Sequence, residues 1–96
     1  MTVKVLIESE PKPDTFENLL GFLETNLPNV RNFDGCISVT VFFDESREKM
    51  LFDEDWASVE HHRKYFQAIT ESGVLAELGS YLSAPPEVKY RIKAAL

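Results

Sequence analysis

The stretch that decides the fold is CISVTVFFDESREKMLFDEDW, residues 36–56, in which two extended segments flank a short polar one. In residues 36–43, large apolar side chains return at every second position, which is the pattern of a strand with one buried face. The polar residues 44–48 suit a hairpin connection, and residues 49–56 resume an extended pattern. The stretch therefore predicts a β-hairpin.

Upstream of the hairpin, the sequence predicts one strand and one helix. Residues 2–9 alternate between apolar and mixed positions and end at the breaker Pro11-Lys12-Pro13. The segment from there to Pro28 has apolar residues at helical spacing. They are Phe16, Leu19, Leu20, Leu23 and Leu27. Residues 29–35 are expected to form a loop that leads into the hairpin.

Downstream of the hairpin, two helices and a last strand are expected. Ser58 can cap the start of a helix and Gly73 can end it. The apolar stripe of this helix consists of Val59, His62, Phe66 and Ile69. A shorter helix over residues 74–82 precedes Pro85-Pro86, which forbids further helix, and residues 88–92 then alternate as a strand.

The order βαββα(α)β predicts an α+β fold of the ferredoxin-like type, with a four-stranded antiparallel sheet. The chain has 96 residues, of which 44% are hydrophobic, so it has the size of one compact domain. No linker, repeat or low-complexity tract interrupts the order of elements. Residues 1–96 are therefore predicted to form a single domain.

The two faces of the predicted sheet differ in character. The helices are expected to cover the face that carries Val3, Val5, Ile7, Ile37, Val39, Val41, Phe43, Val88, Tyr90 and Ile92. The opposite face carries Lys4, Leu6, Thr40, Phe42, Lys89 and Arg91, with Asp53 or Glu54 according to the register of the third strand. This mixture fits a solvated face on a monomer, and it also fits a face covered by a second copy across a two-fold axis.

Charge and cysteine content exclude several classes of partner. The chain has 10 Lys and Arg against 16 Asp and Glu, a net charge of −6, so it repels nucleic acid and anionic membranes. No segment approaches the roughly 20 apolar residues of a membrane span, and the N-terminus lacks a signal-peptide pattern. The one cysteine, Cys36, cannot form an internal disulfide. These features predict a cytoplasmic protein.

Two runs of residues stand out by their order and spacing. Phe33-Asp34-Gly35-Cys36 enters a strand, and DEDWASVEH, residues 53–61, leads into a helix. They resemble the antibiotic-biosynthesis-monooxygenase-like (ABM-like) family of dimeric α+β barrel proteins, whose motif has a Gly-Cys strand start followed by Glu-x-Trp-x-Ser-x-Glu. Residues 71–73 and 85–90 resemble one branch of that family.

The resemblance implies a ferredoxin-like fold, a homodimer whose two sheets face each other, and a pocket between sheet and helices in each subunit. Members of the family include cofactor-independent monooxygenases of quinol-like or polyketide aromatics, haem-degrading enzymes and isomerases, so fold and motif do not fix a reaction. The haem-degrading branch relies on an Asn in the first strand and a His in the second helix. Residues 2–9 contain no Asn, and Tyr65 or Phe66 stands where that His would fall. No haem or other cofactor is therefore expected.

Four residues are candidates for a pocket that takes a small aromatic or hydrophobic ligand. Trp56 could stack on a planar substrate and donate its N–H, or it could anchor the helix start against the sheet. His62 could act as a base, or it could be a core histidine. Tyr65 could carry its hydroxyl into the same cavity or serve packing, and Phe42 would add an apolar wall.

The remaining polar candidates have simpler interpretations. His61 and His62 are neighbours on a helix and point about 100° apart, so they cannot grip one metal ion together, and no metal site is expected. Arg31 and Asp34 could bind an acidic group or each other, although loop charges are usually solvated. Cys36 is interpreted as small buried packing.

These residues support two hypotheses of different classes. The first is a cofactor-independent monooxygenase in which His62 or water deprotonates a phenol, after which the carbanion-like substrate itself reacts with oxygen. The second is a non-catalytic dimeric module that binds a small ligand or assists another protein. A catalyst should have His62 or Tyr65 facing a cavity, whereas a binding module can fill that space with core side chains.

Overall fold

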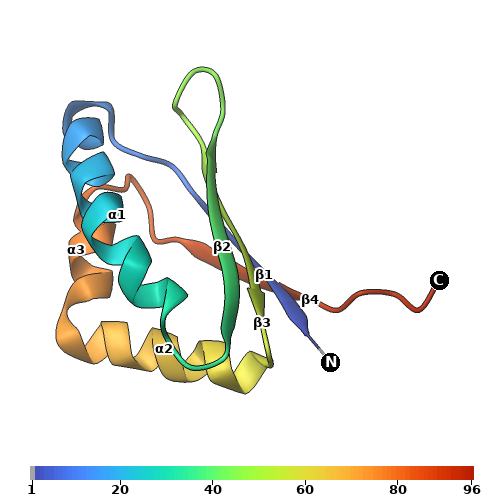
Figure 1. Ribbon diagram of the computed structural model, residues 1–96. Coiled ribbons are helices and arrows are strands. Elements are labelled where there is room, and N and C mark those ends of the chain that lie inside the picture. Colours follow the sequence, from blue (N-terminus) through green and yellow to red (C-terminus); the bar gives the residue numbers. More distant parts are fainter. Residues whose placement is uncertain (1) are drawn as a thin grey trace.

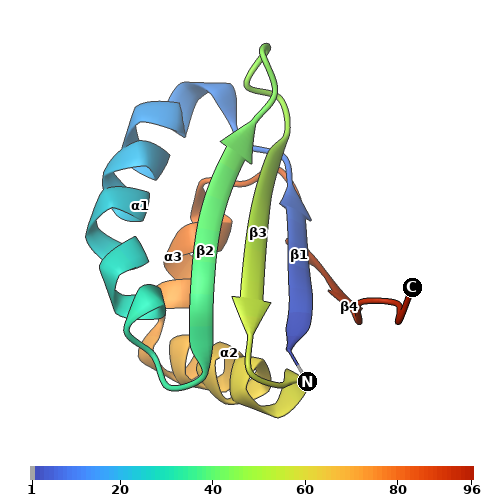
Figure 2. The same ribbon diagram turned by 45° about the vertical axis from the view of Figure 1, so that its right-hand side comes forward.

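The computed structural model describes residues 2–96, so Met1 lies outside the described part of the predicted domain. The four strands form one antiparallel sheet in the order β2-β3-β1-β4, and the helices cover one of its faces (Figures 1 and 2). The elements are β1 (Val3–Ser9), a 3₁₀ turn (Pro13–Thr15), α1 (Phe16–Arg31), β2 (Cys36–Phe43), β3 (Met50–Trp56), α2 (Val59–Ser72), α3 (Val74–Ser80) and β4 (Glu87–Arg91). The predicted ferredoxin-like α+β fold is confirmed.

The core lies between the sheet and the helices. Buried apolar side chains come from β1, α1, β2, β3 and α3, and Val5, Leu19, Met50 and Trp56 are fully enclosed. On α1 the buried set is Phe16, Leu19, Phe22, Leu23 and Val30. Leu20, which the sequence placed on the apolar stripe, is only half-buried, since Phe22 takes the more central position.

Helix α1 does not end at Pro28 as predicted, because it continues to Arg31 with Pro28 inside it. Proline removes one backbone donor but has a φ angle that a helix accepts. The carbonyl that loses its partner is that of Glu24, an exposed residue, so it can be hydrated, while the following turn buries Val30 in the core. The predicted loop over residues 29–35 is shortened accordingly.

Two residues assigned to the buried sheet face lie outside it. Ile37 is 57% exposed, because a β-bulge lets Cys36 pair with Trp56 and Ser38 with Asp55, which leaves Ile37 as the extra residue. Ile92 is exposed because β4 ends at Arg91, opposite Lys4 near the start of β1. Sequence periodicity assumes an unbroken ladder and therefore missed both.

The ends of α2 follow the predicted chemistry. The Ser58 side chain accepts a hydrogen bond of 3.1 Å from the His61 backbone N–H, and Gly73 follows the helix with a φ of 87°. Gly35, in the turn before β2, also has positive φ, and an added Cβ there would overlap the His61 side chain. This close approach joins the start of α2 to the turn before β2. Helix α3 ends at Ser80, two residues before the predicted end.

A pair of neighbouring leucines tests the orientation of α1. We expect Leu19→Ala to lower the free energy of unfolding by about 2–5 kcal/mol, since Leu19 is fully enclosed and its removal leaves a cavity. The matched control Leu20→Ala should cost clearly less, because Leu20 keeps part of its surface in water. Urea denaturation at fixed pH measures both, and a larger loss for Leu20→Ala would mean that α1 is rotated.

Candidate functional site

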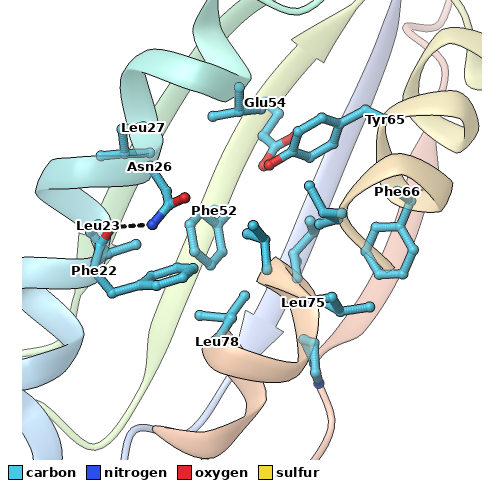
Figure 3. A pocket seen from close by; sticks show the side chains of 15 residues that line it. Phe22, Leu23, Asn26, Leu27, Phe52, Glu54, Tyr65, Phe66, Leu75 and Leu78 are labelled. Atoms are coloured by element: carbon cyan, nitrogen blue, oxygen red, sulfur yellow. Dashed lines mark hydrogen bonds between the residues drawn. The ribbon is translucent and has the colours of Figure 1, made fainter. Parts of the chain in front are cut away.

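A small cavity lies between the sheet and all three helices (Figure 3). Its volume is about 50 Å³, and most of its wall is apolar. The lining residues that matter for chemistry are Asn26 from α1, Glu54 from β3 and Tyr65 from α2. Glu54 and Tyr65 point to the same part of the cavity in Figure 3. The cavity therefore combines an apolar wall with a few polar groups, as ligand sites do.

Glu54 is the residue that sequence reasoning left undecided. Strand β3 places Phe52, Glu54 and Trp56 on the helix side, and Glu54 is only 3% exposed. The Trp56 indole N–H donates a hydrogen bond of 2.8 Å to Glu54 Oε1. Burial raises the pKa of Glu54 from its ordinary value of 4.5 to about 7, while the bond from Trp56 works in the opposite direction. A carboxyl group with this pKa can take up or release a proton near neutral pH.

His62 lies directly behind Glu54 and does not line the cavity. Its ring is fully buried, with Nδ1 at 2.9 Å from the Tyr90 hydroxyl and Nε2 at 3.9 Å from Glu54 Oε1. Burial lowers the pKa of His62 from 6.5 to about 4. His62 is therefore neutral at pH 7.

Tyr65 brings its ring to the cavity from α2 and packs against Phe33 and Trp56. Burial, followed by the negative charge of Glu54, raises the pKa of Tyr65 above its ordinary value. The hydroxyl therefore stays protonated at neutral pH and can act as a hydrogen-bond donor.

Trp56 and Phe42 occupy very different places. Trp56 is fully enclosed, and its ring contacts Phe33, His62 and Tyr65 behind the cavity wall. Phe42 lies on the open side of the sheet, 51% exposed, and lines a separate hollow. The fold thus brings Trp56, His62 and Tyr65 together around Glu54 and keeps Phe42 apart from them.

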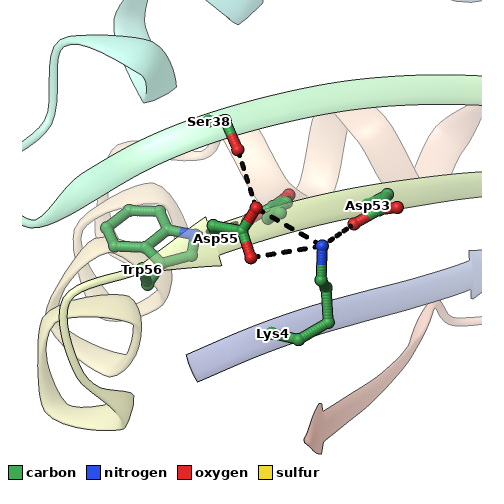
Figure 4. Close-up of polar contacts among 6 residues, drawn as sticks. Lys4, Ser38, Asp53, Asp55 and Trp56 are labelled. Atoms are coloured by element: carbon green, nitrogen blue, oxygen red, sulfur yellow. Dashed lines mark hydrogen bonds and ion pairs between the residues drawn. The ribbon is translucent and has the colours of Figure 1, made fainter. Parts of the chain in front are cut away.

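The alternating side chains of β3 explain why one acid enters the core and two do not. Asp53 and Asp55 point to the open face, where Lys4 Nζ lies 2.8 Å from Asp53 and 3.1 Å from Asp55 (Figure 4). Ser38 also donates a hydrogen bond to Asp55. These two carboxylates therefore have ordinary surface partners, whereas the buried Glu54 between them accepts a hydrogen bond from Trp56 and faces His62.

The other polar candidates take part in local structure. His61 contacts Ser58 through Nδ1 at 2.6 Å and lies 3.8 Å from Asp34, on the surface. Arg31 donates two hydrogen bonds to the Val39 carbonyl, which ties the end of α1 to β2. Cys36 is half-buried, and burial raises the pKa of its thiol. Within residues 2–96, no group of three or more His, Cys, Asp or Glu side chains is arranged to hold a metal ion.

Asn26 is a second residue that sequence reasoning missed. Its amide nitrogen donates a hydrogen bond of 2.9 Å to the Phe22 carbonyl, as Figure 3 shows, so its oxygen is the atom left for a ligand. A polar residue inside the apolar face of a predicted helix was the available signal. Tyr90 was assigned to the buried face, but its contact with His62 joins residues 28 positions apart and could not be seen in the sequence.

The sequence was compared with models of known protein families. The family model described as antibiotic biosynthesis monooxygenase matches residues 2–69. The chain belongs to the antibiotic biosynthesis monooxygenase family. The match includes β1, α1, the hairpin and most of α2, and therefore all of the cavity residues with polar side chains. No curated protein matches the chain.

Several solved structures have the same fold. A conserved protein from Methanosarcina mazei Go1 has a TM-score of 0.87 at 15% identity, over 98% of this chain and 94% of that one. Rv0793 from Mycobacterium tuberculosis has a TM-score of 0.85 at 20% identity, over 100% and 98%. A monooxygenase of Streptomyces coelicolor in complex with the ligand nanaomycin D has a TM-score of 0.74 at 20% identity, over 99% and 88%. At these identities the likeness shows the fold alone.

Among the residues that the structure describes, none of the helices has the length and apolar character needed to cross a bilayer.

The opposite pKa shifts of Glu54 and His62 predict how stability depends on pH. Between pH 4.5 and 7 folded Glu54 keeps a proton that the unfolded chain has lost, so its contribution falls as pH rises. Between pH 4 and 6.5 unfolded His62 binds a proton that the folded protein does not, so its contribution rises with pH. The two slopes oppose each other in the wild-type protein.

Glu54→Gln should therefore become more stable by about 3 kcal/mol as pH rises from 4 to 6.5, since only the His62 slope remains. His62→Gln should lose stability between pH 4.5 and 7 for the converse reason. Urea denaturation in small pH steps measures both curves. Parallel curves for the two variants would contradict the assignment of these pKa values.

Proposed function

We propose that the protein is a cofactor-independent monooxygenase of small hydroxylated aromatic compounds, and that Glu54 is the base that takes the phenolic proton. The observation that carries the proposal is the buried Glu54 carboxyl, which faces an apolar cavity and has a pKa of about 7. A general base works best when its pKa is near the working pH. The proposal replaces His62 with Glu54 in this role, because neutral His62 stands behind the carboxyl rather than at the cavity.

The reaction balances without an external electron donor. Deprotonation by Glu54 turns a hydroquinone into an electron-rich phenolate, which transfers an electron to O₂, and the resulting radical pair forms a carbon–oxygen bond. The ring hydroperoxide then loses water, so hydroquinone and O₂ become hydroxyquinone and water. The ring supplies the electrons, one oxygen atom enters the product, and the proton held by Glu54 returns in the water.

The neighbours of Glu54 have supporting roles in this proposal. Trp56 holds the carboxyl at a fixed position through its N–H. The Tyr65 hydroxyl, which stays protonated, can donate to a ring oxygen as negative charge develops on it. The Asn26 oxygen can accept from a second hydroxyl group. The cavity wall offers acceptors and a neutral donor without a Lys or Arg, which favours a neutral phenolic ring over a carboxylate or phosphate ester.

The cavity must widen before it accepts such a ring. Its 50 Å³ suit a few water molecules, whereas small-molecule sites usually have about 300 Å³ or more. Leu75 and Leu78 of α3 form part of the wall, and α3 follows the left-handed residue Gly73. Movement of this short helix away from α1 would enlarge the cavity without disturbing β3. The nanaomycin D complex of the Streptomyces coelicolor relative supports ligand binding by this fold.

Oxygen consumption with hydroquinone tests the proposed activity. The wild-type protein should consume O₂ above the background of buffer and substrate, should keep this activity after dialysis against a chelator, and should be inactive with 1,4-cyclohexanediol. Glu54→Gln should lower turnover by about 10²-fold or more while it keeps the hydrogen bond to Trp56 and the fold.

Glu60→Gln is the matched control. Glu60 is an exposed glutamate on α2, so this substitution removes the same charge without changing the cavity. Wild-type turnover in Glu54→Gln would remove Glu54 from the mechanism. Binding of hydroquinone with no oxygen consumption by any variant would favour the second hypothesis, a non-catalytic binding module of the same fold.

We also propose that two copies associate through the open face of the sheet. Phe42 is exposed on this face, near the end of the edge strand β2. Its cross-strand neighbour Leu51 and Leu6 of β1 are half-buried on the same face. Within one chain, Lys4 pairs with Asp53 and Asp55, and Lys89 lies 3.5 Å from Glu8, while Arg91 lies at the end of the edge strand β4. A second copy can therefore cover the apolar residues without leaving a buried charge unpaired.

Sedimentation equilibrium at micromolar concentration should therefore report a dimer. Phe42→Asp should give a monomer, because the new carboxylate would be buried without a partner between the two sheets. Ala68→Asp, a substitution on the exposed side of α2, is the control and should leave the dimer intact. A wild-type monomer, or a dimer in Phe42→Asp, would mean that this face is solvated.

A further inference from the structure

The two ring nitrogens of His62 face different polar groups. Nδ1 lies 2.9 Å from the Tyr90 hydroxyl, and Nε2 lies 3.9 Å from Glu54 Oε1 without a hydrogen-bond partner of its own among the described residues. An unpartnered ring nitrogen in a fully buried side chain is unfavourable. Nε2 of His62 points toward Glu54, the buried carboxyl of the cavity, and packing alone does not explain this orientation.

The series Glu54, His62, Tyr90 begins at the cavity and ends near the outside. Tyr90 lies on the edge strand β4 and lines an open hollow of about 420 Å³ between β4 and α2. Arg63 and Gln67 of α2 share this hollow, and the Arg63 guanidinium stands 5.6 Å from the centre of the Tyr90 ring. The three side chains come from β3, α2 and β4, so the fold itself assembles the series.

We propose that Glu54, His62 and Tyr90 form a proton path that connects the internal cavity with solvent beside β4. The path rests on the proposed function and extends it, since it would let Glu54 exchange its proton with solvent and so reach its ionised state before a substrate binds. It can be tested without any substrate. In this proposal His62 and Tyr90 do not touch the substrate. They are positioning residues that act on the reaction through Glu54.

The transfer conserves protons and charge at each step. Protonated Glu54 gives its proton to His62 Nε2, the Nδ1–H of the ring passes a proton to the Tyr90 oxygen, and the Tyr90 O–H releases one to water. The ring then carries its hydrogen on Nε2, and the same series in reverse brings a proton from water back to Glu54 and restores the first tautomer, so the path exchanges protons in both directions. The Glu54–His62 distance must shorten to about 3 Å for transfer, which a small rotation of the carboxyl can provide.

The charged and titratable groups around the path fit this role. A neutral imidazole can accept and release protons without remaining charged, and the low pKa of His62 keeps it neutral at pH 7. Cys36 and Tyr65 approach the Glu54 carboxyl from β2 and α2, and the pKa of each is raised, so neither adds a charge. Asp53, on the far face of β3, further raises the pKa of Glu54.

The cavity offers a weaker alternative route to solvent. Its wall toward α1 and α3 consists of apolar side chains apart from Asn26, whose amide nitrogen is already bonded to Phe22. An amide group cannot release and rebind a proton as imidazole and phenol do. Water that enters the cavity would be the competing route, and the substitutions below distinguish it from the route through His62 and Tyr90.

Trp56 provides a direct signal for the experiment, since it is the single tryptophan and donates to Glu54. Its fluorescence should change with a midpoint near pH 7 as Glu54 ionises. A temperature jump in a buffer whose pKa changes with temperature would shift pH rapidly, and the relaxation of Trp56 fluorescence would then give the rate of proton exchange. Tyr90→Phe should keep the midpoint and amplitude of the fluorescence titration. It should slow the relaxation by about tenfold or more, because one hydrogen-bonded step of the path is lost.

Tyr81→Phe is the matched control, because the Tyr81 hydroxyl donates to Glu77 on the surface. The relaxation of Trp56 fluorescence in this variant should equal that of the wild-type protein. His62→Gln, which can hydrogen bond but cannot relay a proton, should slow the relaxation as Tyr90→Phe does and gives a second test if one variant fails to fold. A wild-type relaxation rate in either variant would overturn the path, as would a wild-type protein whose fluorescence does not change around pH 7. Failure of hydroquinone oxidation would leave these rates unaffected, so the two proposals fail separately.

Discussion

The hydrogen bond from the Trp56 indole N–H to the Glu54 carboxyl is the contact on which the site depends. A carboxyl group in an apolar interior is unfavourable unless it is neutral or has a donor. Here it has one strong donor and a raised pKa, so at pH 7 it is divided between its two protonation states. Trp56 is itself fixed by the rings of Phe33, His62 and Tyr65, and these contacts hold the carboxyl at the cavity wall.

Strand β3 makes this arrangement possible because it carries three acids in a row on alternating faces. The register pairs Glu54 with Val5 of β1 and Val39 of β2, so two buried valines flank the carboxyl. Asp53 and Asp55 fall on the open face, next to Lys4. A slip of one residue would expose Glu54 and bury both aspartates, so the ion pairs on the outer face also help to keep the acid of the inner face in place.

The elements and their order could be predicted because each depends on local periodicity and on a few breakers. Ser58 and Gly73 bound α2 as expected, since capping is decided within one helical turn. Pro28 misled the prediction, since the burial of Val30 maintains a helix that the local sequence would end. Ile37 was misplaced for a similar reason, because a bulge depends on the partner strand.

The site was predictable only in part, because its geometry depends on contacts between elements that are distant in the sequence. The helical stripe correctly indicated that His62 turns inward, but not that it would stand behind another acid. Phe42 could be assigned to a face of its strand, yet that face is the one opposite the cavity, which the ligand hypothesis did not take into account. Glu54 was missed because its face depends on the register of β3, and register is a property of the whole sheet.

The energetics of Glu54 give the strongest reason to connect the cavity with function. At pH 7 the raised pKa means that the folded protein is less stable than it would be with a neutral amide at this position. Packing alone would be served by glutamine, which has nearly the same shape and can accept the Trp56 hydrogen bond without an ionisable proton. Similarity to solved structures at 15–20% identity shows the fold alone, and a fold does not by itself fix a reaction. An ionisable group that lowers stability, faces a cavity and titrates near pH 7 is what proton transfer requires, and a purely structural role does not account for it.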